Sequence, residues 1–287
     1  MPAFRLTLDM ITAKLHRVMA RGEVLGTATH HALYFVLDHF LGEPWLHEHV
    51  LYECARPGYL TMKPAIGDGG YGIDKAHTQR VLQLAEALFN LQGTPGLDLC
   101  LDRLFSGQIE STMAELDFGM FMSLQGTRFR YVEPSGVKGQ DYDVELLYPD
   151  GEVACGDIKC KLDGSEFAAK GLLSTLKKAR RQLPHDRPGI AFVKVPQEWV
   201  DRTNGNLGLG KEVPALLNEF FKGTRRVVLV AFYSKLTTDT PKGTAINYVA
   251  RQFENADSRF SRTGSWDLFD VTQQKPRWIN FSSALRA

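Results

Sequence analysis

Residues 140–164 read QDYDVELLYPDGEVACGDIKCKLDG and place charged residues inside two strand-like runs. The second run, GEVACGDIKCKL, is typical of a strand, in which side chains alternate between the two faces of a sheet. Asp157 and Lys159 then share one face, and Ile158 points to the other. An apolar core can accept Ile158, but unpaired buried charge is costly. The charged face is therefore expected either to be exposed to solvent or to serve a chemical function.

The turn residues Pro-Asp-Gly at 149–151 predict that this strand forms a hairpin with the preceding run, YDVELLYP. Three carboxylates share one face of that run: Asp141, Asp143 and Glu145. Because adjacent strands lie about 5 Å apart, this acidic face can meet Asp157. Two carboxylates brought that close repel each other unless a cation or a proton lies between them. A hard divalent ion such as Mg²⁺ suits this arrangement, since it binds a few carboxylate oxygens and keeps several waters.

The hairpin resembles the signature of the PD-(D/E)xK nuclease superfamily, in which an aspartate is followed, after a spacer, by acid-x-lysine. Here Asp143 precedes the tripeptide Asp157-Ile158-Lys159. The resemblance implies that Asp143 and Asp157 hold Mg²⁺ or Mn²⁺, with the carbonyl of Ile158 as a further ligand. It also implies that Lys159 positions or activates the attacking water. The similarity covers roughly residues 105–235.

The stretch AELDFGMFMSLQG, which precedes the strands, resembles the first helix of the family. A glutamate on that helix often completes the metal site, and the resemblance implies Glu115 for this role, with Glu110 as the second choice. The sequence departs from the pattern in having Tyr142 where the family signature has proline. Gln182 is followed four residues later by Asp186 rather than tyrosine, so the family branch with that glutamine-tyrosine pair is not supported.

The order of expected elements predicts the fold class. After a helix and three strands, the sequence predicts a helix, a strand, a helix and a strand at 165–184, 189–196, 213–223 and 225–236. We therefore expect an α/β domain with a restriction-endonuclease-like mixed sheet flanked by helices, over residues 101–287. Residues 1–100 show apolar residues at helical spacing and are expected to form a mostly helical N-terminal region.

A cluster of basic residues follows the hairpin: Lys161, Lys177, Lys178, Arg180 and Arg181. Near a metal site these side chains could contact phosphates, whose binding is electrostatic and depends on salt. The alternative is that the basic run is only the solvated face of a helix. Arg225 and Arg226 are weaker candidates for the same contact.

Composition bounds the alternatives. The net charge of +1 gives no overall attraction to a polyanion, so a nucleic-acid site must come from local clustering. The four cysteines form no CxxC pair, which argues against a zinc ribbon and fits reduced thiols in a cytoplasmic protein. No apolar run approaches the roughly 20 residues of a membrane helix, so we expect no membrane partner.

The sequence thus predicts a metal-dependent nuclease, an endo- or exodeoxyribonuclease acting on DNA. A homodimer contact or a partner protein is expected at the N-terminal region. Two alternatives stay open: a nuclease-fold binding module without catalysis, and a nucleotide-binding enzyme centred on GDGGYG at 67–72. For the hairpin itself, the plain alternative is a solvated sheet face with Lys-Asp cross-strand pairs, each contributing roughly 0.2–1 kcal/mol.

Overall fold

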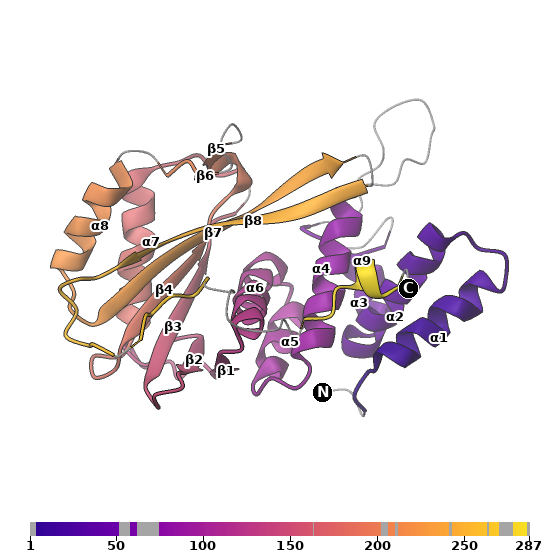
Figure 1. Cartoon of the computed structure of the whole chain (residues 1–287), viewed down its shortest axis with the longest axis horizontal. Helices are drawn as coiled ribbons and strands as arrows, with labels where there is room; N and C mark the ends of the chain where they lie inside the picture. Colours follow the sequence, from indigo (N-terminus) through magenta and orange to yellow (C-terminus); the bar gives the residue numbers. More distant parts are fainter. Residues whose placement is uncertain are drawn as a thin grey trace. The chain divides into compact units, whose positions relative to one another are not determined.

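The computed structural model of the chain (Figure 1) describes residues 4–51, 58–61, 75–162, 164–201, 206–209, 212–240, 243–262, 264–269 and 278–285. The chain forms two compact units. The first unit contains Met1–Gly93, Cys100–Leu116 and Trp278–Ala287, and the second contains Thr94–Leu99 and Asp117–Arg277. This division differs from a simple boundary at residue 100, because two later segments belong to the first unit.

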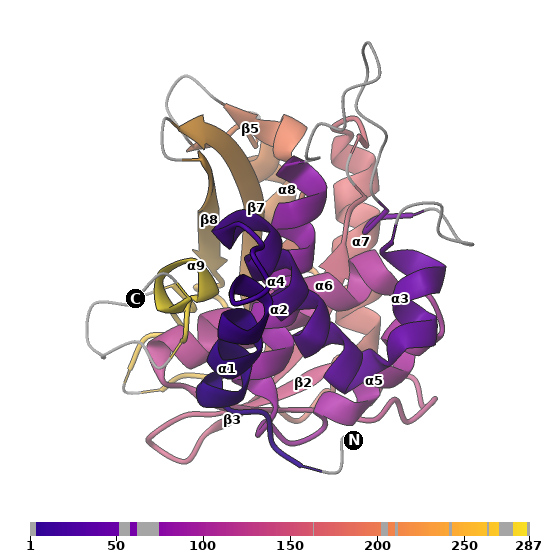
Figure 2. The same ribbon diagram turned by 90° about the vertical axis from the view of Figure 1, so that its right-hand side faces the viewer.

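In its described residues the first unit is helical, as the N-terminal pattern predicts. Its helices are α1 (Leu8–Met19), α2 (Leu25–Leu41), α3 (Glu43–His49), α4 (Lys75–Leu91), most of α5 (Leu97–Phe105), the first half of α6 (Ile109–Gln125) and α9 (Phe281–Ala284). Helices α1 and α2 lie side by side (Figure 2). The chain end returns to α4, where the Phe281 and Phe89 rings lie 5.2 Å apart. The Asn90 side chain also bonds both backbone polar groups of Ile279.

The second unit is built on a six-stranded mixed sheet of β1 (Arg128–Tyr131), β2 (Val144–Leu147), β3 (Val153–Cys160), β4 (Gly189–Lys194), β7 (Val227–Thr240) and β8 (Gly243–Glu254), in the order β1-β2-β3-β4-β7-β8. Strands β1, β2 and β3 are antiparallel, β3, β4 and β7 are parallel, and β8 is antiparallel to β7. After the 3-10 turn η1 (Gln197–Trp199), two short strands, β5 (Val200–Asp201) and β6 (Asn206–Leu207), form a separate ribbon that the sequence did not predict. The predicted α/β class is confirmed.

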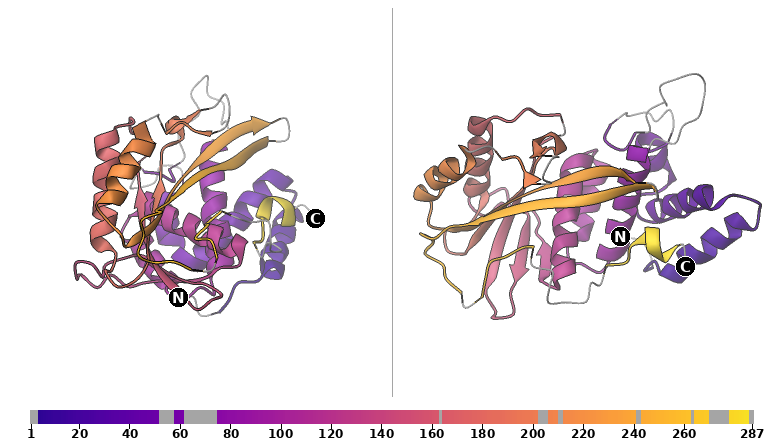
Figure 3. Two further views of the ribbon diagram at one scale, coloured as in Figure 1. Left: turned by 60° about the vertical axis from the view of Figure 1, so that its left-hand side comes forward. Right: turned by 45° about the horizontal axis from the view of Figure 1, so that its top comes forward.

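Helices cover both faces of this sheet. Helices α7 (Ala169–Gln182) and α8 (Glu212–Lys222) lie side by side over one face (Figures 1 and 3). Helix α7 buries Leu172, Leu176 and Ala179 at helical spacing. The second half of α6 packs on the other face, where Phe118 meets Phe192 of β4 at a ring distance of 5.1 Å. Because both faces are covered, β4 is buried along its whole length and reads as a continuous apolar run.

The predicted hairpin between β2 and β3 is present. Gly151 adopts a φ of 87° in the turn, a left-handed conformation that favours glycine. The turn is held from outside by Arg262, a residue more than a hundred positions later in the chain. Its guanidinium lies 3.9 Å from the centroid of the Tyr148 ring, and its Nε donates to Asp150 at 3.0 Å. This clamp fixes the turn end of the strand pair that carries the charged residues.

We expect Gly156→Ala to lower the free energy of unfolding by about 1–3 kcal/mol, because a small-to-large change here overpacks the strand pair. Gly156 stands opposite Val144 in the register, and an added Cβ would lie 2.6 Å from Val144 Cγ2. Adding Val144→Ala removes the clashing methyl groups, so the double variant should be more stable than the sum of the single effects predicts. Urea denaturation of the four proteins measures this coupling.

Gly26→Ala is the matched control, since an added Cβ there meets nothing within 4 Å and alanine favours the helix. Strict additivity of the Gly156 and Val144 substitutions would show that their contact does not set the strand spacing.

Candidate active site

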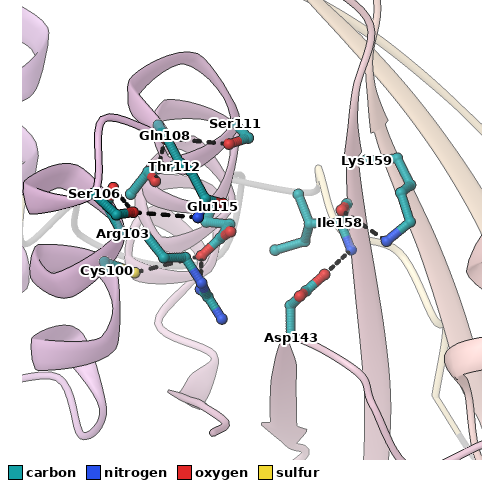
Figure 4. Close-up of polar contacts among 10 residues, drawn as sticks. All are labelled: Cys100, Arg103, Ser106, Gln108, Ser111, Thr112, Glu115, Asp143, Ile158 and Lys159. Atoms are coloured by element: carbon teal, nitrogen blue, oxygen red, sulfur yellow. Dashed lines mark hydrogen bonds and ion pairs between the residues drawn. The ribbon is translucent and has the colours of Figure 1, made fainter. Parts of the chain in front are cut away.

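Asp143 and Asp157 face each other across the hairpin. The register ends at the pair of Val144 and Gly156, and Asp143, one residue before β2, donates its backbone N–H to the carbonyl of Gly156 at 3.0 Å, next to Asp157. The Asp143 side chain accepts a hydrogen bond of 2.6 Å from the backbone N–H of Ile158 (Figure 4). The backbone of β3 therefore holds the carboxylate of Asp143 beside that of Asp157.

Asp157 is fully buried. Its neighbours on the same face, Cys155 on β3 and Ala191 on β4, are also fully buried. Burial raises the pKa of Asp157 well above its ordinary range, and the nearby charge of Asp143 raises it further, while Lys159 lowers it. The ionised form of this carboxylate is therefore held in the fold at the expense of stability.

Lys159 is the only cation paired with Asp157 in the described part of the chain. Its Nζ donates to Asp157 Oδ1 at 2.8 Å and lies 2.7 Å from Oδ2, which has no well-aligned hydrogen bond of its own. The same Nζ lies 3.4 Å from the carbonyl oxygen of Ile158. The Lys159 side chain is 23% exposed, so this ammonium reaches the edge of the site.

The oxygens around Lys159 fit a hard divalent ion. They comprise the carboxylate of Asp157 and the carbonyl of Ile158, with the carboxylate of Asp143 held close by. Mg²⁺ and Mn²⁺ bind such oxygen donors and use waters for the remaining positions. In the residues that the structure describes, no three His, Cys, Asp or Glu side chains gather into a metal-binding group. A site here would thus consist of two carboxylates, a backbone carbonyl and waters.

Glu145, the third acid expected on this face, serves a structural network. Its carboxylate pairs with Arg130 at 2.6 Å and Arg187 at 2.8 Å, and it accepts a hydrogen bond from the Tyr142 hydroxyl at 2.7 Å. Burial by itself raises the pKa of Glu145, but these three donors outweigh it and lower the pKa below the ordinary value. Glu145 is therefore stably ionised and already neutralised.

The remaining acid of the predicted face, Asp141, binds the loop before β2, and its charge is a smaller further cause of the raised pKa of Asp157. One of its carboxylate oxygens accepts from the backbone N–H of Gly136, within the loop before β2. The plain alternative of a solvated face does not fit Asp157, which has no exposed surface. The structure thus separates the four predicted acids: Glu145 is paired with arginines, Asp141 binds a loop, Asp157 is paired with Lys159, and Asp143 accepts from the Ile158 amide.

Glu115 lies in the first unit and has partners there. It is 7% exposed, forms an ion pair with Arg103, and lies 3.6 Å from the Cys100 thiol, which donates to it (Figure 4). The second choice, Glu110, occupies the first turn of α6. A metal-binding role for Glu115 remains a prediction, and the ion pair with Arg103 is a structural role that the sequence did not suggest.

Asp117 is an α6 carboxylate that the sequence analysis missed. It is buried in the second unit, where it accepts from the Tyr233 hydroxyl at 2.7 Å and pairs with Lys235 at 2.8 Å. Burial raises the pKa of Tyr233, and the charge of Asp117 adds to the effect. Tyr233 and Lys235 are two residues apart on β7 and therefore share one face of the strand, which the sequence pattern shows. Their common partner, Asp117, lies 116 residues before Tyr233.

The predicted basic residues do not form one continuous face. Lys161 donates to the carbonyl of Gly171 at 3.3 Å, at the start of α7. Lys177 lies 3.8 Å from Glu219 of α8, whereas Lys178 is exposed. Arg180 and Arg181 line a pocket at the other end of α7. The predicted basic residues therefore cannot all contact phosphate through one shared surface.

The fold and site define an α/β protein whose sheet carries two adjacent carboxylates and a lysine on one β-hairpin. No protein-family model matches the sequence, and no curated protein sequence matches it significantly. The GDGGYG motif at 67–72 lies outside the described residues. Among the helices that the structure describes, none is long and apolar enough to cross a membrane.

We expect Asp157→Asn to flatten the pH dependence of stability in the metal-free protein. Because the pKa of Asp157 is raised on folding, the folded chain keeps a proton that the unfolded chain loses near its ordinary value of 3.8. The free energy of unfolding therefore falls as pH rises from that value through the raised pKa, and asparagine removes this loss. Urea denaturation in EDTA at about pH 5 and about pH 8 gives the change in unfolding free energy with pH for the wild type and for Asp157→Asn.

Asp141→Asn is the control: its charge is only a minor cause of the raised pKa of Asp157, so it should change the pH dependence much less than Asp157→Asn does. Equal slopes for the wild type and Asp157→Asn would contradict a raised pKa. Saturating Mg²⁺ should stabilise the wild type more than Asp157→Asn, because the ion binds only the folded site.

Proposed function

We propose that the protein is a metal-dependent nuclease that hydrolyses phosphodiester bonds in DNA, as an endo- or exodeoxyribonuclease. The observation that carries this proposal is the pair of Asp143 and Asp157 on adjacent strands, with Asp143 held by the Ile158 amide and Asp157 paired with Lys159. A buried carboxylate with a raised pKa reduces stability, and such groups cluster at functional sites. A divalent cation would relieve the repulsion between the two carboxylates.

Each residue of the hairpin has a distinct part in this chemistry. Asp143, Asp157 and the Ile158 carbonyl would hold Mg²⁺ or Mn²⁺, while the Ile158 amide keeps Asp143 oriented. When bound, the metal supplies positive charge beside the phosphate and lowers the pKa of a bound water. Lys159, whose ammonium contacts both Asp157 oxygens, would position the attacking water by hydrogen bonding and stabilise negative charge that develops on the phosphate.

The arrangement of the second unit supports a restriction-endonuclease-like fold as part of the same proposal. The chain order α6, β1, β2, β3, α7, β4 follows the order that the resemblance implies. The antiparallel hairpin followed by a parallel crossover into β4 places the charged residues on the central strands. In this proposal the enzyme acts in the cytoplasm, and the helical unit selects the substrate or contacts a partner, including a second copy of the chain.

A nuclease-fold binding module without catalysis is the second candidate. It is favoured by the ion pair between Lys159 and Asp157, which neutralises Asp157 without any metal. The two candidates share the fold and differ only in whether the hairpin performs chemistry.

We expect the wild type to cleave supercoiled or linear DNA with Mg²⁺ or Mn²⁺, and EDTA to abolish the cleavage. Asp143→Asn, Asp157→Asn and Lys159→Gln should each lower the rate by about 10²-fold or more, because each removes a ligand or the water-positioning group. Gel assays with DNA and with RNA of the same sequence measure the rates and identify the substrate.

Asp141→Asn is the matched control and should keep full activity, because its carboxylate binds the neighbouring loop. Cleavage that persists unchanged in all three site variants would reject the site. A wild type that is inert toward every DNA and RNA substrate, with either metal, would favour the binding module.

A further inference from the structure

A basic pocket of about 350 Å³ lies in the second unit, where α7 and α8 end. Six cationic or titratable side chains line it: Arg180, Arg181, His185, Arg225, Arg226 and Arg259. They come from the end of α7, the loop after it, the segment before β7 and the segment after β8. Five arginines from three segments that are distant in sequence therefore converge on one small volume.

No carboxylate neutralises this pocket in the described part of the chain. None of its five arginines forms an ion pair there, although Arg130, Arg187 and Arg262 elsewhere in the unit all do. The nearby Asp257 contributes only its backbone carbonyl, which accepts from Arg225 at 3.3 Å. Burial and then the charges of Arg180 and Arg259 lower the pKa of Arg226. The arginines thus repel one another without a protein counter-ion.

Only some of the N–H groups of these arginines form hydrogen bonds within the protein. Arg180 donates to the carbonyl of Gly223 at 2.9 Å, and Arg226 donates through Nη2 to the carbonyl of Arg180. These bonds satisfy carbonyls at helix ends, where cations are favoured. Arg226 Nε and Nη1, however, are shielded from solvent and have no hydrogen-bond partner. Because Nη1 and the Nε–H lie on opposite sides of the guanidinium, these two groups do not form a fork, and Arg226 adds an uncompensated positive charge with two unsatisfied donors to the pocket.

We infer that this pocket binds a phosphate group of the nucleic-acid strand that the hairpin acts on, an inference that rests on the proposed function. The register supports a shared substrate. Val227, next to Arg226, pairs with Gly189, which pairs with Cys155 of β3. Asp157 is fully buried, and the exposed group of the site is Lys159. Two strands across and four residues along separate Val227 from Lys159, so their backbones lie about 16 Å apart. About five phosphates of a B-form strand span that distance.

The test is DNA binding without catalysis. Fluorescence anisotropy with a labelled duplex, in EDTA and over a salt series, gives the affinity and its salt dependence. Arg181→Gln and Arg259→Gln should each weaken binding about fivefold, for any sequence, and each should reduce the salt slope by about 1. Arg226→Lys keeps the charge but loses the guanidinium donors, including the bond to the carbonyl of Arg180, and it should also weaken binding.

Lys222→Gln is the matched control, because Lys222 is exposed on α8 and outside the pocket. It should change the affinity less than about twofold. Thermal denaturation of every variant separates lost binding from lost folding. Equal effects of Lys222→Gln and the pocket variants would overturn the inference, since they would indicate only a diffuse basic surface.

Competition with inorganic phosphate distinguishes a strand phosphate from a free anion. If phosphate stabilises the wild type but not Arg226→Lys, while DNA affinity is unchanged in all pocket variants, the pocket binds a free anion and the inference is wrong. If pocket variants lose DNA affinity but no cleavage occurs with any metal, the pocket stands and the nuclease proposal fails. If cleavage depends on Asp157 while pocket variants bind DNA normally, the nuclease proposal stands and the pocket inference fails.

Discussion

The hydrogen bond from the Ile158 amide to Asp143 is the contact on which the candidate site depends, because it fixes one carboxylate beside another on the neighbouring strand. The surrounding structure keeps that contact in register. Gly156 leaves room for the side chain opposite it, and Arg262 clamps the turn that joins the two strands. Parallel pairing of β3 with β4 then buries Asp157 between apolar strands and beneath a helix layer. Local backbone geometry and long-range packing therefore both determine the positions of the Asp143 and Asp157 side chains.

The second unit shows how this fold normally accommodates a buried acid. Glu145 receives two arginines and a tyrosine hydroxyl, and Asp117 receives a lysine and a tyrosine hydroxyl. Both arrangements satisfy the charge and the hydrogen-bonding capacity of the carboxylate, as burial requires. Asp157 has one lysine, shared between its two oxygens, and a second carboxylate nearby. This contrast within one domain supports a functional role for Asp157 over a structural one.

Positive charge in this protein is local. The chain has a net charge of only +1, yet five arginines meet at the ends of α7 and α8 without carboxylate partners among the described residues. Such clustering concentrates the positive electrostatic potential at one place although the net charge of the whole chain is small. Under the inference drawn above, a strand with regularly spaced phosphates would contact the pocket and the hairpin at once, whereas a small anion would fill only the pocket.

The sequence by itself determined the elements and the motif. Alternation along β3, the Pro-Asp-Gly turn and the apolar stripe of α7 are local patterns, so they predict strand, hairpin and helix within a few residues. They also predict that Asp143 and Asp157 meet, because a hairpin fixes its own register. Only the tertiary structure decided which charges are compensated. Arg187 reaches Glu145 across 42 residues and Tyr233 reaches Asp117 across 116, and no local pattern specifies such partners. The basic pocket likewise exists only because sheet topology brings together segments that are unrelated in sequence.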